Sequence, residues 1–400
     1  MSADVAIIGA GYTGLSTARY LAASGVEPVV IEASRIGWGA SGRNGGVVSG
    51  KFRIGFAEMA RRWDLETARR MHDLGIEAID HVGETIEELG IKGADYRPTG
   101  SLRCAHNQVA LDALRAEADW LTGTLGDQAI SMLGPEEMKA ETGSRDFPGG
   151  MLNRHGGVIH PLNYVLGMAR ALAGQGIRIY CETPVTRLGR TADGIELHTD
   201  RGVVRARQVV IATNGYSDLT PATDAVRRRL IPFRSAMIAT ELLDRPMLEH
   251  DRSYTETRRM MRWFRKAGGR LVYGGRGAFG KADSAAAFAA LEKAMRRQFP
   301  QLAGVAVTHR WSGLVGMTMD SLPHLSRLDD RVTFSLGYNG TGVALASMIG
   351  RHAARMVLGQ KTDAGLLTSE ALRPVPFYEI REPAVRLVAG YYQFLDAIGR

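Results

Sequence analysis

The sequence predicts an α/β protein with two domains, one built on a parallel sheet and the other, inserted into it, built on an antiparallel sheet. Short apolar runs such as residues 5–8 and 209–212 are typical of fully buried parallel strands, and a helical segment follows the first of them. Longer strand-like runs lie in residues 231–274. The chain has 400 residues, 45% hydrophobic and 23% charged, which leaves room for two globular domains.

A glycine-rich turn and a helix directly follow the first strand. Gly9 allows a tight turn, Gly11 lets the backbone approach a pyrophosphate, and Gly14 lets the helix pack on the strand. The next apolar run ends in Glu32, eighteen residues after Gly14, where a carboxylate can accept the hydroxyls of a ribose. This order predicts a dinucleotide site with the phosphates at the helix N-terminus. The alternative is an ordinary βαβ unit in which Glu32 is only solvated.

A second glycine-rich segment, residues 39–46, surrounds Arg43 and Asn44 with small residues. So many glycines make the segment too flexible for a helix or a strand, and the placement of Arg43 and Asn44 among them is too specific for a simple linker. We therefore expect a loop that wraps a ligand with its backbone amides.

Several stretches resemble one family of flavoproteins. VAIIGAGYTGLSTA at residues 5–18, VVIEASRIGWGASGRNGG at 29–46, ATNG at 212–215 and GYNGTG at 337–342 resemble the D-amino-acid oxidase-like family, which includes glycine and sarcosine oxidases. Within it the chain is most similar to the gamma-glutamylputrescine oxidase type, and the resemblance reaches about Gly359. It implies FAD rather than NAD, in a Rossmann-like domain of the glutathione-reductase type. Some relatives attach FAD covalently through a cysteine near Met317, but none stands here, so we expect non-covalent FAD.

The resemblance also implies which residues surround the FAD. The first turn and the second strand supply Gly9, Gly11, Tyr12, Thr13, Gly14, Glu32, Ala33 and Ser34. The second glycine-rich segment supplies Gly39, Ala40, Ser41, Gly42, Arg43, Asn44, Gly45 and Gly46. Later segments supply Val185 beside the adenine, Ala212, Thr213 and Asn214 beneath the FAD, Gly313, and then Gly337, Asn339, Gly340, Thr341, Gly342 and Val343. The last group opens a helix whose N-terminus can stabilise negative charge on the flavin ring. Close relatives often carry a histidine in place of Thr341.

We expect the FAD-binding domain to come from three stretches, residues 1–92, 151–222 and 307–362. The substrate domain comes from residues 93–150 and 223–306, and residues 363–400 form a C-terminal helical tail. Trp263, Phe264 and Tyr273 either line the substrate cavity or form the core of the sheet that roofs it.

The activity that the resemblance implies is oxidation of a primary or secondary amine, such as gamma-glutamylputrescine or an amino acid derivative, by hydride transfer to the flavin. Oxygen is the expected acceptor, with an imine or aldehyde and hydrogen peroxide as products. The catalytic candidates are Lys281, Arg276 and Tyr338. The guanidinium group of Arg276 can bind a carboxylate through two parallel hydrogen bonds. The positive charge of Lys281 or Arg43 can accelerate the reaction of the reduced flavin with oxygen. The alternative for Arg276 and Lys281 is that both lie on a solvated loop. A dehydrogenase with another acceptor and a tRNA-modifying flavoprotein remain alternatives.

The composition limits the kinds of molecule that the protein is expected to bind. Lys and Arg exceed Asp and Glu by 50 − 42 = 8, but no basic run is longer than residues 227–229, so we expect a small-molecule partner and no nucleic acid. Cys104 and Cys181 are the only cysteines, which favours a reducing cytoplasm. No apolar stretch reaches the roughly 18 residues that span a bilayer, and we expect no signal peptide before the first strand. His155 and His160 lack the helical spacing of a metal pair, so no metal is expected. The oligomeric state is left open.

Overall fold

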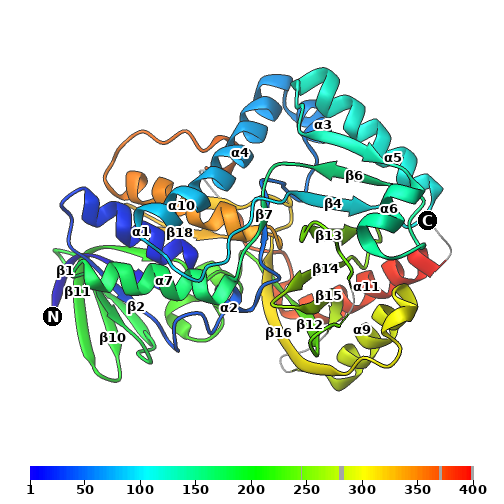
Figure 1. The fold of residues 1–400 in the computed structure, drawn as a ribbon. Helices are drawn as coiled ribbons and strands as arrows, with labels where there is room; N and C mark the ends of the chain where they lie inside the picture. Colours follow the sequence, from blue (N-terminus) through cyan, green and yellow to red (C-terminus); the bar gives the residue numbers. More distant parts are fainter. Residues whose placement is uncertain (245, 279–282, 369–371, 398–400) are drawn as a thin grey trace.

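The computed structural model describes the whole chain except residue 245 and residues 279–282, 369–371 and 398–400. Figure 1 shows two lobes side by side, each built on a sheet of eight strands. No helix in the described part of the chain is long and apolar enough to cross a membrane.

The first lobe contains a mainly parallel sheet. Its strands follow the order β17, β18, β11, β1, β2, β8, and β9 and β10 extend it from β11. The strands are β1 Ser2–Ile8, β2 Pro28–Ile31, β8 Arg178–Tyr180, β9 Arg187–Arg190, β10 Ile195–Thr199, β11 Gly202–Ile211, β17 His324–Arg327 and β18 Val332–Leu336. The helices of this lobe are α1 Tyr12–Ala23, α2 Ala40–Arg43, α3 Phe56–Arg62, α4 Leu65–Glu88, α7 Pro161–Gly174, α8 Asp224–Arg227 and α10 Gly342–Val357, with α3 and α4 reaching the second lobe.

The centre of this sheet positions the site. Strand β1 pairs in parallel with β2 on one side and β11 on the other, so that Ile8 lies beside both Ile31 and Ile211. These three residues are buried, as expected of a parallel sheet covered on both faces. The three strands end at the same edge. The segments that follow them, which begin at Gly9, Glu32 and Ala212, therefore meet there.

The second lobe contains a mainly antiparallel sheet in the order β16, β12, β15, β14, β13, β4, β6, β5. Its strands are β4 Ser101–Cys104, β5 Ile130–Leu133, β6 Gly150–Asn153, β12 Ile231–Thr240, β13 Ser253–Glu256, β14 Arg262–Ala267, β15 Arg270–Ala278 and β16 Val307–Met317. Its helices are α5 Gln108–Trp120, α6 Pro135–Thr142, α9 Ala285–Gln298 and α11 Arg381–Ala397, and a short ladder of β3 Val47–Val48 and β7 Gly157–Val158 lies between the lobes. The predicted α/β fold with an inserted antiparallel domain is confirmed.

Two strands lie in a different sheet from the one that the sequence boundaries imply. We assigned residues 307–362 and 151–222 to the FAD-binding domain, but β16 and β6 pair within the second sheet. Strand β16 pairs with β12 over ten residues, from Ile231 opposite Met317 to Thr240 opposite Val307. Strand periodicity shows which face of a sheet a residue occupies but not which sheet the strand joins, so the sequence placed both boundaries too early by one strand.

Candidate active site

The turn after β1 has the shape that a dinucleotide site requires. Gly9 has a φ of +106°, a conformation that residues with side chains rarely adopt. A Cβ at Gly14 would overlap the carbonyl oxygen of Gly9, so only glycine lets α1 begin this close to the strand. The N-cap residue Gly11 contributes no side-chain cap. The N-terminus of α1 therefore offers backbone amides and a favourable dipole to a phosphate at the edge of the sheet.

Two backbone amides fix the side chain of Glu32 at the end of β2. Its Oε2 accepts a hydrogen bond from the amide of Ala10 at 2.8 Å, and its Oε1 accepts one from the amide of Ser34 at 2.9 Å. Each carboxylate oxygen keeps a second lone pair, and Glu32 lines the cavity described below. The carboxylate is therefore held beside the first turn, where it can accept the hydroxyls of a ribose.

Residues 39–46 are more regular than their glycine content suggests. Residues 40–43 form the short helix α2, although we expected neither helix nor strand in this segment. The Asn44 side chain explains the difference. Its Nδ2 donates to the carbonyl oxygens of Ala40 and Ser41, both at 3.0 Å, and its Oδ1 accepts from the amide of Gly46 at 2.8 Å. One asparagine thus satisfies backbone groups that a single helical turn leaves free.

The side chain of Arg43 connects this loop to the second sheet. Its Nε donates to the carbonyl oxygen of Trp38 at 2.5 Å, and its Nη1 donates to the carbonyl oxygen of Ser312 at 3.1 Å. In return, Nε1 of Trp311 donates to the carbonyl oxygen of Arg43 at 2.9 Å. Arg43 lines the cavity but is held by these bonds, and its effect on oxygen stays a prediction.

Two asparagines connect the turns that close the site from the first lobe. Oδ1 of Asn214 accepts a hydrogen bond from the amide of Gly337 at 2.9 Å. Oδ1 of Asn339 accepts one from the amide of Thr318, also at 2.9 Å. The turn after β11 and the turn before α10 are therefore fixed to each other and to the end of β16.

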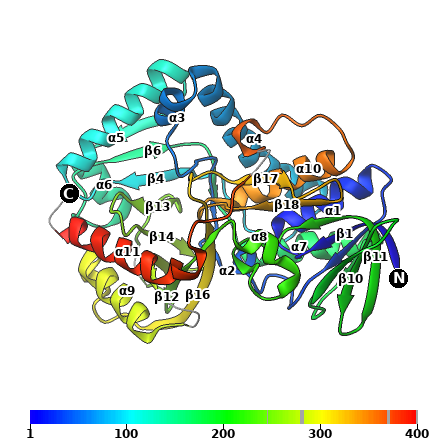
Figure 2. The same ribbon diagram turned by 180° about the vertical axis from the view of Figure 1, so that it is seen from behind.

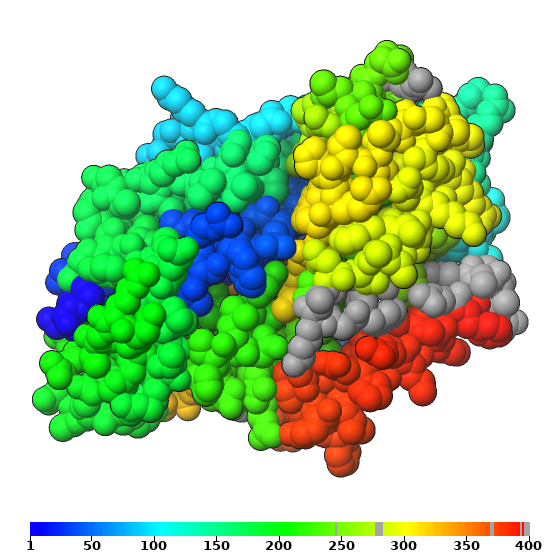
Figure 3. All heavy atoms as spheres, turned by 90° about the horizontal axis from the view of Figure 1, so that it is seen from below, coloured from blue at the N-terminus to red at the C-terminus, as the bar shows by residue number. Residues whose placement is uncertain are grey.

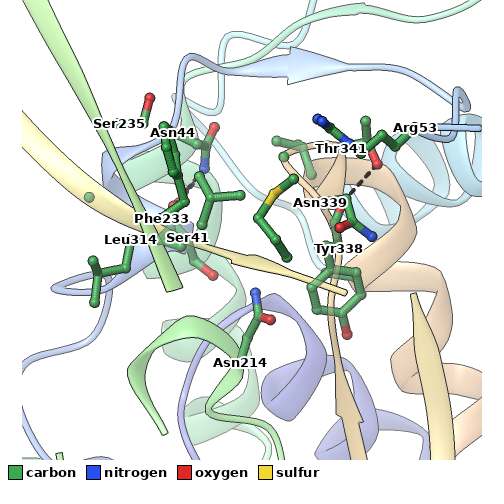
Figure 4. A pocket seen from close by; sticks show the side chains of 18 of the residues that line it. Ser41, Asn44, Arg53, Asn214, Phe233, Ser235, Leu314, Tyr338, Asn339 and Thr341 are labelled. Atoms are coloured by element: carbon green, nitrogen blue, oxygen red, sulfur yellow. Dashed lines mark hydrogen bonds between the residues drawn. The ribbon is translucent and has the colours of Figure 1, made fainter. Parts of the chain in front are cut away.

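These segments surround a cavity of about 950 Å³. The predicted residues that line it are Gly9, Gly11, Tyr12, Thr13, Glu32, Ala33, Gly39, Ala40, Ser41, Arg43, Asn44, Gly45, Val185, Ala212, Thr213, Asn214, Arg276, Gly313, Tyr338, Asn339, Gly340, Thr341, Gly342 and Val343. Figure 4 shows Ser41, Asn44 and Ser235 toward one side of the pocket and Tyr338, Asn339, Thr341 and Arg53 toward the other. The predicted residues Gly14, Ser34, Gly42, Gly46 and Gly337 are not among those that line it. At Gly14, Gly42 and Gly46 a Cβ would overlap a backbone carbonyl oxygen, so these glycines shape the turns.

The second sheet forms the opposite wall of the cavity. Alternate residues of its strands line the cavity, namely Arg103, Thr255, Trp263, Arg276, Ser235 and Gly313. Of the three aromatic residues considered from the sequence, only Trp263 lines it. Phe264 and Tyr273 lie on the other face, where they are fully buried and their rings stack 5.9 Å apart. These two residues belong to the core of the sheet.

The cavity wall is rich in cations. Arg103 is paired with Glu117, with Nη1 at 2.5 Å from Oε2, but no hydrogen bond or ion pair within the described residues reaches the side-chain nitrogens of Lys51, Arg53 or Arg276. Burial, with the charges of Arg103 and Arg276, lowers the pKa of the Lys51 ammonium to about 8. Burial and the charge of Arg53 lower the pKa of the Arg276 guanidinium to about 10. The wall therefore holds like charges close together in a poorly solvated place.

Sequence reasoning missed Lys51 and Arg53. They stand in the segment that follows the second glycine-rich block, and a packing contact positions that segment. A Cβ at Gly50 would overlap the backbone of Gly75 in α4, and the reverse also holds, so the two backbones touch directly. The sequence signal was the pair of glycines, but their contact depends on the tertiary fold.

The other two catalytic candidates differ in what the structure shows. The hydroxyl of Tyr338 lies 2.6 Å from Oγ1 of Thr13 and 2.8 Å from Oγ of Ser335, inside the first lobe. Burial raises the pKa of Tyr338 to about 12, so this hydroxyl is poorly suited to act as a base at neutral pH. Lys281 lies outside the described residues. Catalytic roles for both stay predictions.

Comparisons with known proteins agree with this geometry. Residues 4–356 match the family described as DAO, FAD dependent oxidoreductase. The chain is 32% identical to the probable oxidoreductase OrdL of Haemophilus influenzae, an alignment that covers 98% of this chain and 92% of that protein. It is 31% identical to the gamma-glutamylputrescine oxidoreductase of Escherichia coli, over 100% of this chain and 94% of that protein. Among solved structures, glycine oxidase from Geobacillus kaustophilus matches with a TM-score of 0.78 at 21% identity, covering 90% of this chain and 96% of that one.

Proposed function

This chain belongs to the DAO family of FAD-dependent oxidoreductases, and from that premise we propose that it is an oxidase of an amine that carries a carboxylate. Gamma-glutamylputrescine, which the name of the E. coli relative contains, is the leading candidate because it has a primary amine at the putrescine end and, at the glutamyl end, a carboxylate beside an ammonium group. The substrate, the use of oxygen and the formation of peroxide belong to this proposal.

The proposal rests on cations in the cavity wall that have no hydrogen-bond or ion-pair partner in the part of the chain that the structure describes. A carboxylate would neutralise part of the charge of Lys51, Arg53 and Arg276, and a guanidinium fork binds a carboxylate with two parallel hydrogen bonds. The same positive charges lower the pKa of a substrate ammonium that enters the cavity, because like charges disfavour the protonated form. A neutral amine is the form that can give up a hydride. The same group of cations therefore favours binding of the carboxylate at one end of the substrate and the reactive neutral form of the amine at the other.

The chemistry comes from the cofactor. FAD, when bound, accepts a hydride from the carbon next to the amine and allows the electrons to pass to oxygen. The resulting imine takes up water. In sum, a primary amine, oxygen and water give an aldehyde, ammonia and hydrogen peroxide. The chain must bind the substrate, orient its reacting C–H bond and shield the site, and Trp263 and the Arg276 strand form the wall that can do so.

A substitution of Arg276 tests the carboxylate part of the proposal. We expect Arg276→Ala to raise the KM for gamma-glutamylputrescine by at least about tenfold and the KM for putrescine far less, because only the first substrate loses a charged partner. Arg270→Ala is the matched control, since Arg270 lies on the same strand but does not line the cavity. Equal increases in KM for the two amines would contradict the proposal.

A further inference from the structure

The C-terminal helix α11 lies outside the part of the chain that matches the family, residues 4–356. Figures 2 and 3 show it as a ridge that runs along the second lobe. Its inward side is a stripe at helical spacing, made of Val385, Ala389, Tyr392 and Leu395, all of which are partly or fully buried. The helix therefore covers the second lobe with one face.

The segment before α11 is fastened to the first lobe. The amide of Val375 donates to the carbonyl oxygen of Arg228 at 2.7 Å, and Nη2 of Arg228 pairs with Oε1 of Glu379 at 2.5 Å. The ring of Tyr378 lies 4.0 Å below the guanidinium of Arg381, which is the first residue of α11. These contacts fix where the helix starts and in which direction it leaves.

Tyr392 reaches the cavity from this helix. It lines the cavity together with Arg53 and Arg276, and the guanidinium of Arg259 lies 5.9 Å from the centre of its ring. Its neighbour Tyr391 points away and is 57% exposed. Burial is the main cause of the lowered pKa of Arg276, the charge of Arg53 adds to it, and Tyr392 acts in the opposite direction. The three side chains are thus close enough to influence one another.

Two guanidinium groups that line one cavity without a counter-ion repel each other, and this repulsion disfavours their charged forms. Arg53 and Arg276 have no acidic partner within the described residues, and Arg276 is half-buried whereas Arg53 is exposed. A phenol can donate a hydrogen bond to an anion but cannot neutralise a cation while it is protonated. An anion with several acceptor atoms would relieve the repulsion between the two guanidinium groups and could also accept a hydrogen bond from a phenol.

We propose that α11 is part of the substrate site and that Tyr392, with Arg53 and Arg276, forms the subsite for the carboxylate end of the substrate. This inference rests on the proposed function and deepens it, because it assigns specificity to an element outside the family match. Arg53 comes from the segment after β3, Arg276 from β15 and Tyr392 from α11, so the subsite forms only when the three elements are docked. Tyr392 is a specificity-determining residue, and it takes no part in the transfer of hydride.

A binding experiment with an inert dicarboxylate tests the subsite. The holoenzyme is titrated with glutarate, and the absorbance change of the bound FAD reports the Kd. We expect Tyr392→Ala to raise this Kd by about tenfold, and Tyr392→Phe to raise it by a smaller factor because the ring still closes the subsite. Tyr391→Ala is the matched control and leaves the Kd unchanged, since Tyr391 does not line the cavity.

The two proposals fail separately. Equal glutarate Kd values for Tyr392→Ala, Tyr391→Ala and the unchanged protein would overturn the subsite, even if amines are oxidised. So would an increase in KM for putrescine as large as that for gamma-glutamylputrescine in Tyr392→Ala. Failure of every amine to bleach the FAD would instead overturn the proposed function, while the glutarate titration would still report on Tyr392.

Discussion

Glu32 shows how one side chain connects the fold to the cofactor. Its two oxygens accept hydrogen bonds from the amides of Ala10 and Ser34, so it orders the first turn, and the same side chain lines the cavity. We expect Glu32→Ala to weaken FAD binding by about 1–3 kcal/mol, the cost of an unmade charge-assisted hydrogen bond. Titration of the apoprotein with FAD measures this change in binding free energy. Glu27→Ala is the control, because Glu27 is exposed and pairs with Arg178 away from the cavity. An unchanged Kd for FAD in Glu32→Ala would refute this role.

The predictability of the site differs from residue to residue. Gly9, Gly14 and Glu32 could be found from the sequence because the turn, the helix contact and the ribose each demand a particular residue type at a fixed spacing. Lys51 and Arg53 could not. They stand in a segment without a motif, and they reach the cavity only because the backbone there touches α4. Tyr392 depends in the same way on where α11 docks.

At the level of elements, a cluster of ionisable side chains connects helix α4 to two loops of the second lobe. Nε2 of His72 on α4 lies 3.0 Å from Oδ2 of Asp127, and Nε2 of His155 lies 3.2 Å from Oδ1 of the same carboxylate. The hydrogen bond to Asp127 raises the pKa of His155, and the charge of Asp80 adds to it. Burial alone would raise the pKa of Asp127, but its hydrogen bonds with His155 and His72 outweigh burial and lower it.

This cluster predicts a pH-dependent contribution to stability. A histidine whose pKa is raised in the folded state stabilises fully below its unfolded value of about 6.5, and the contribution is lost as the pH rises through the folded value. We expect His155→Gln to lower the free energy of unfolding by about 1 kcal/mol at pH 5.5 and by much less at pH 8.5. Urea unfolding at both pH values measures it, with the exposed His309→Gln as control. A loss of the same size at both pH values would show that the charge of His155 plays no part.

The sequence predicted the type of the elements better than their partners. The buried run before Gly9 and the alternating strand that begins at Arg270 could both be identified, since burial on two faces and on one face leave different patterns. The end of that strand could not, because we expected Arg276 on a turn after it, and Arg276 lies within β15. The sequence could not show that β16 belongs to the second sheet. Its pairing with β12 joins residues about 75 positions apart, and no local sequence pattern predicts such a contact. The helix α2 was missed because a single turn depends on the side chain of Asn44.

Across the whole molecule, the two lobes divide the work. The parallel sheet and its glycine turns line one side of the cavity, and the antiparallel sheet lines another side and contributes Arg276. Lys51 and Arg53 come from the segment after β3. The cavity between the two lobes is the place that we propose for a carboxylate-bearing amine. Its positive wall also accounts for some of the net charge of +8 without a nucleic-acid partner.

The most direct test is a spectrum of the purified holoenzyme without oxygen. We expect gamma-glutamylputrescine, or another carboxylate-bearing amine from a panel that also contains polyamines and amino acids, to bleach the visible absorbance of the FAD. Air should then restore the absorbance and release one hydrogen peroxide for each amine oxidised. An absorbance that no amine bleaches would contradict amine oxidation, and an absorbance that stays bleached in air would contradict an oxidase.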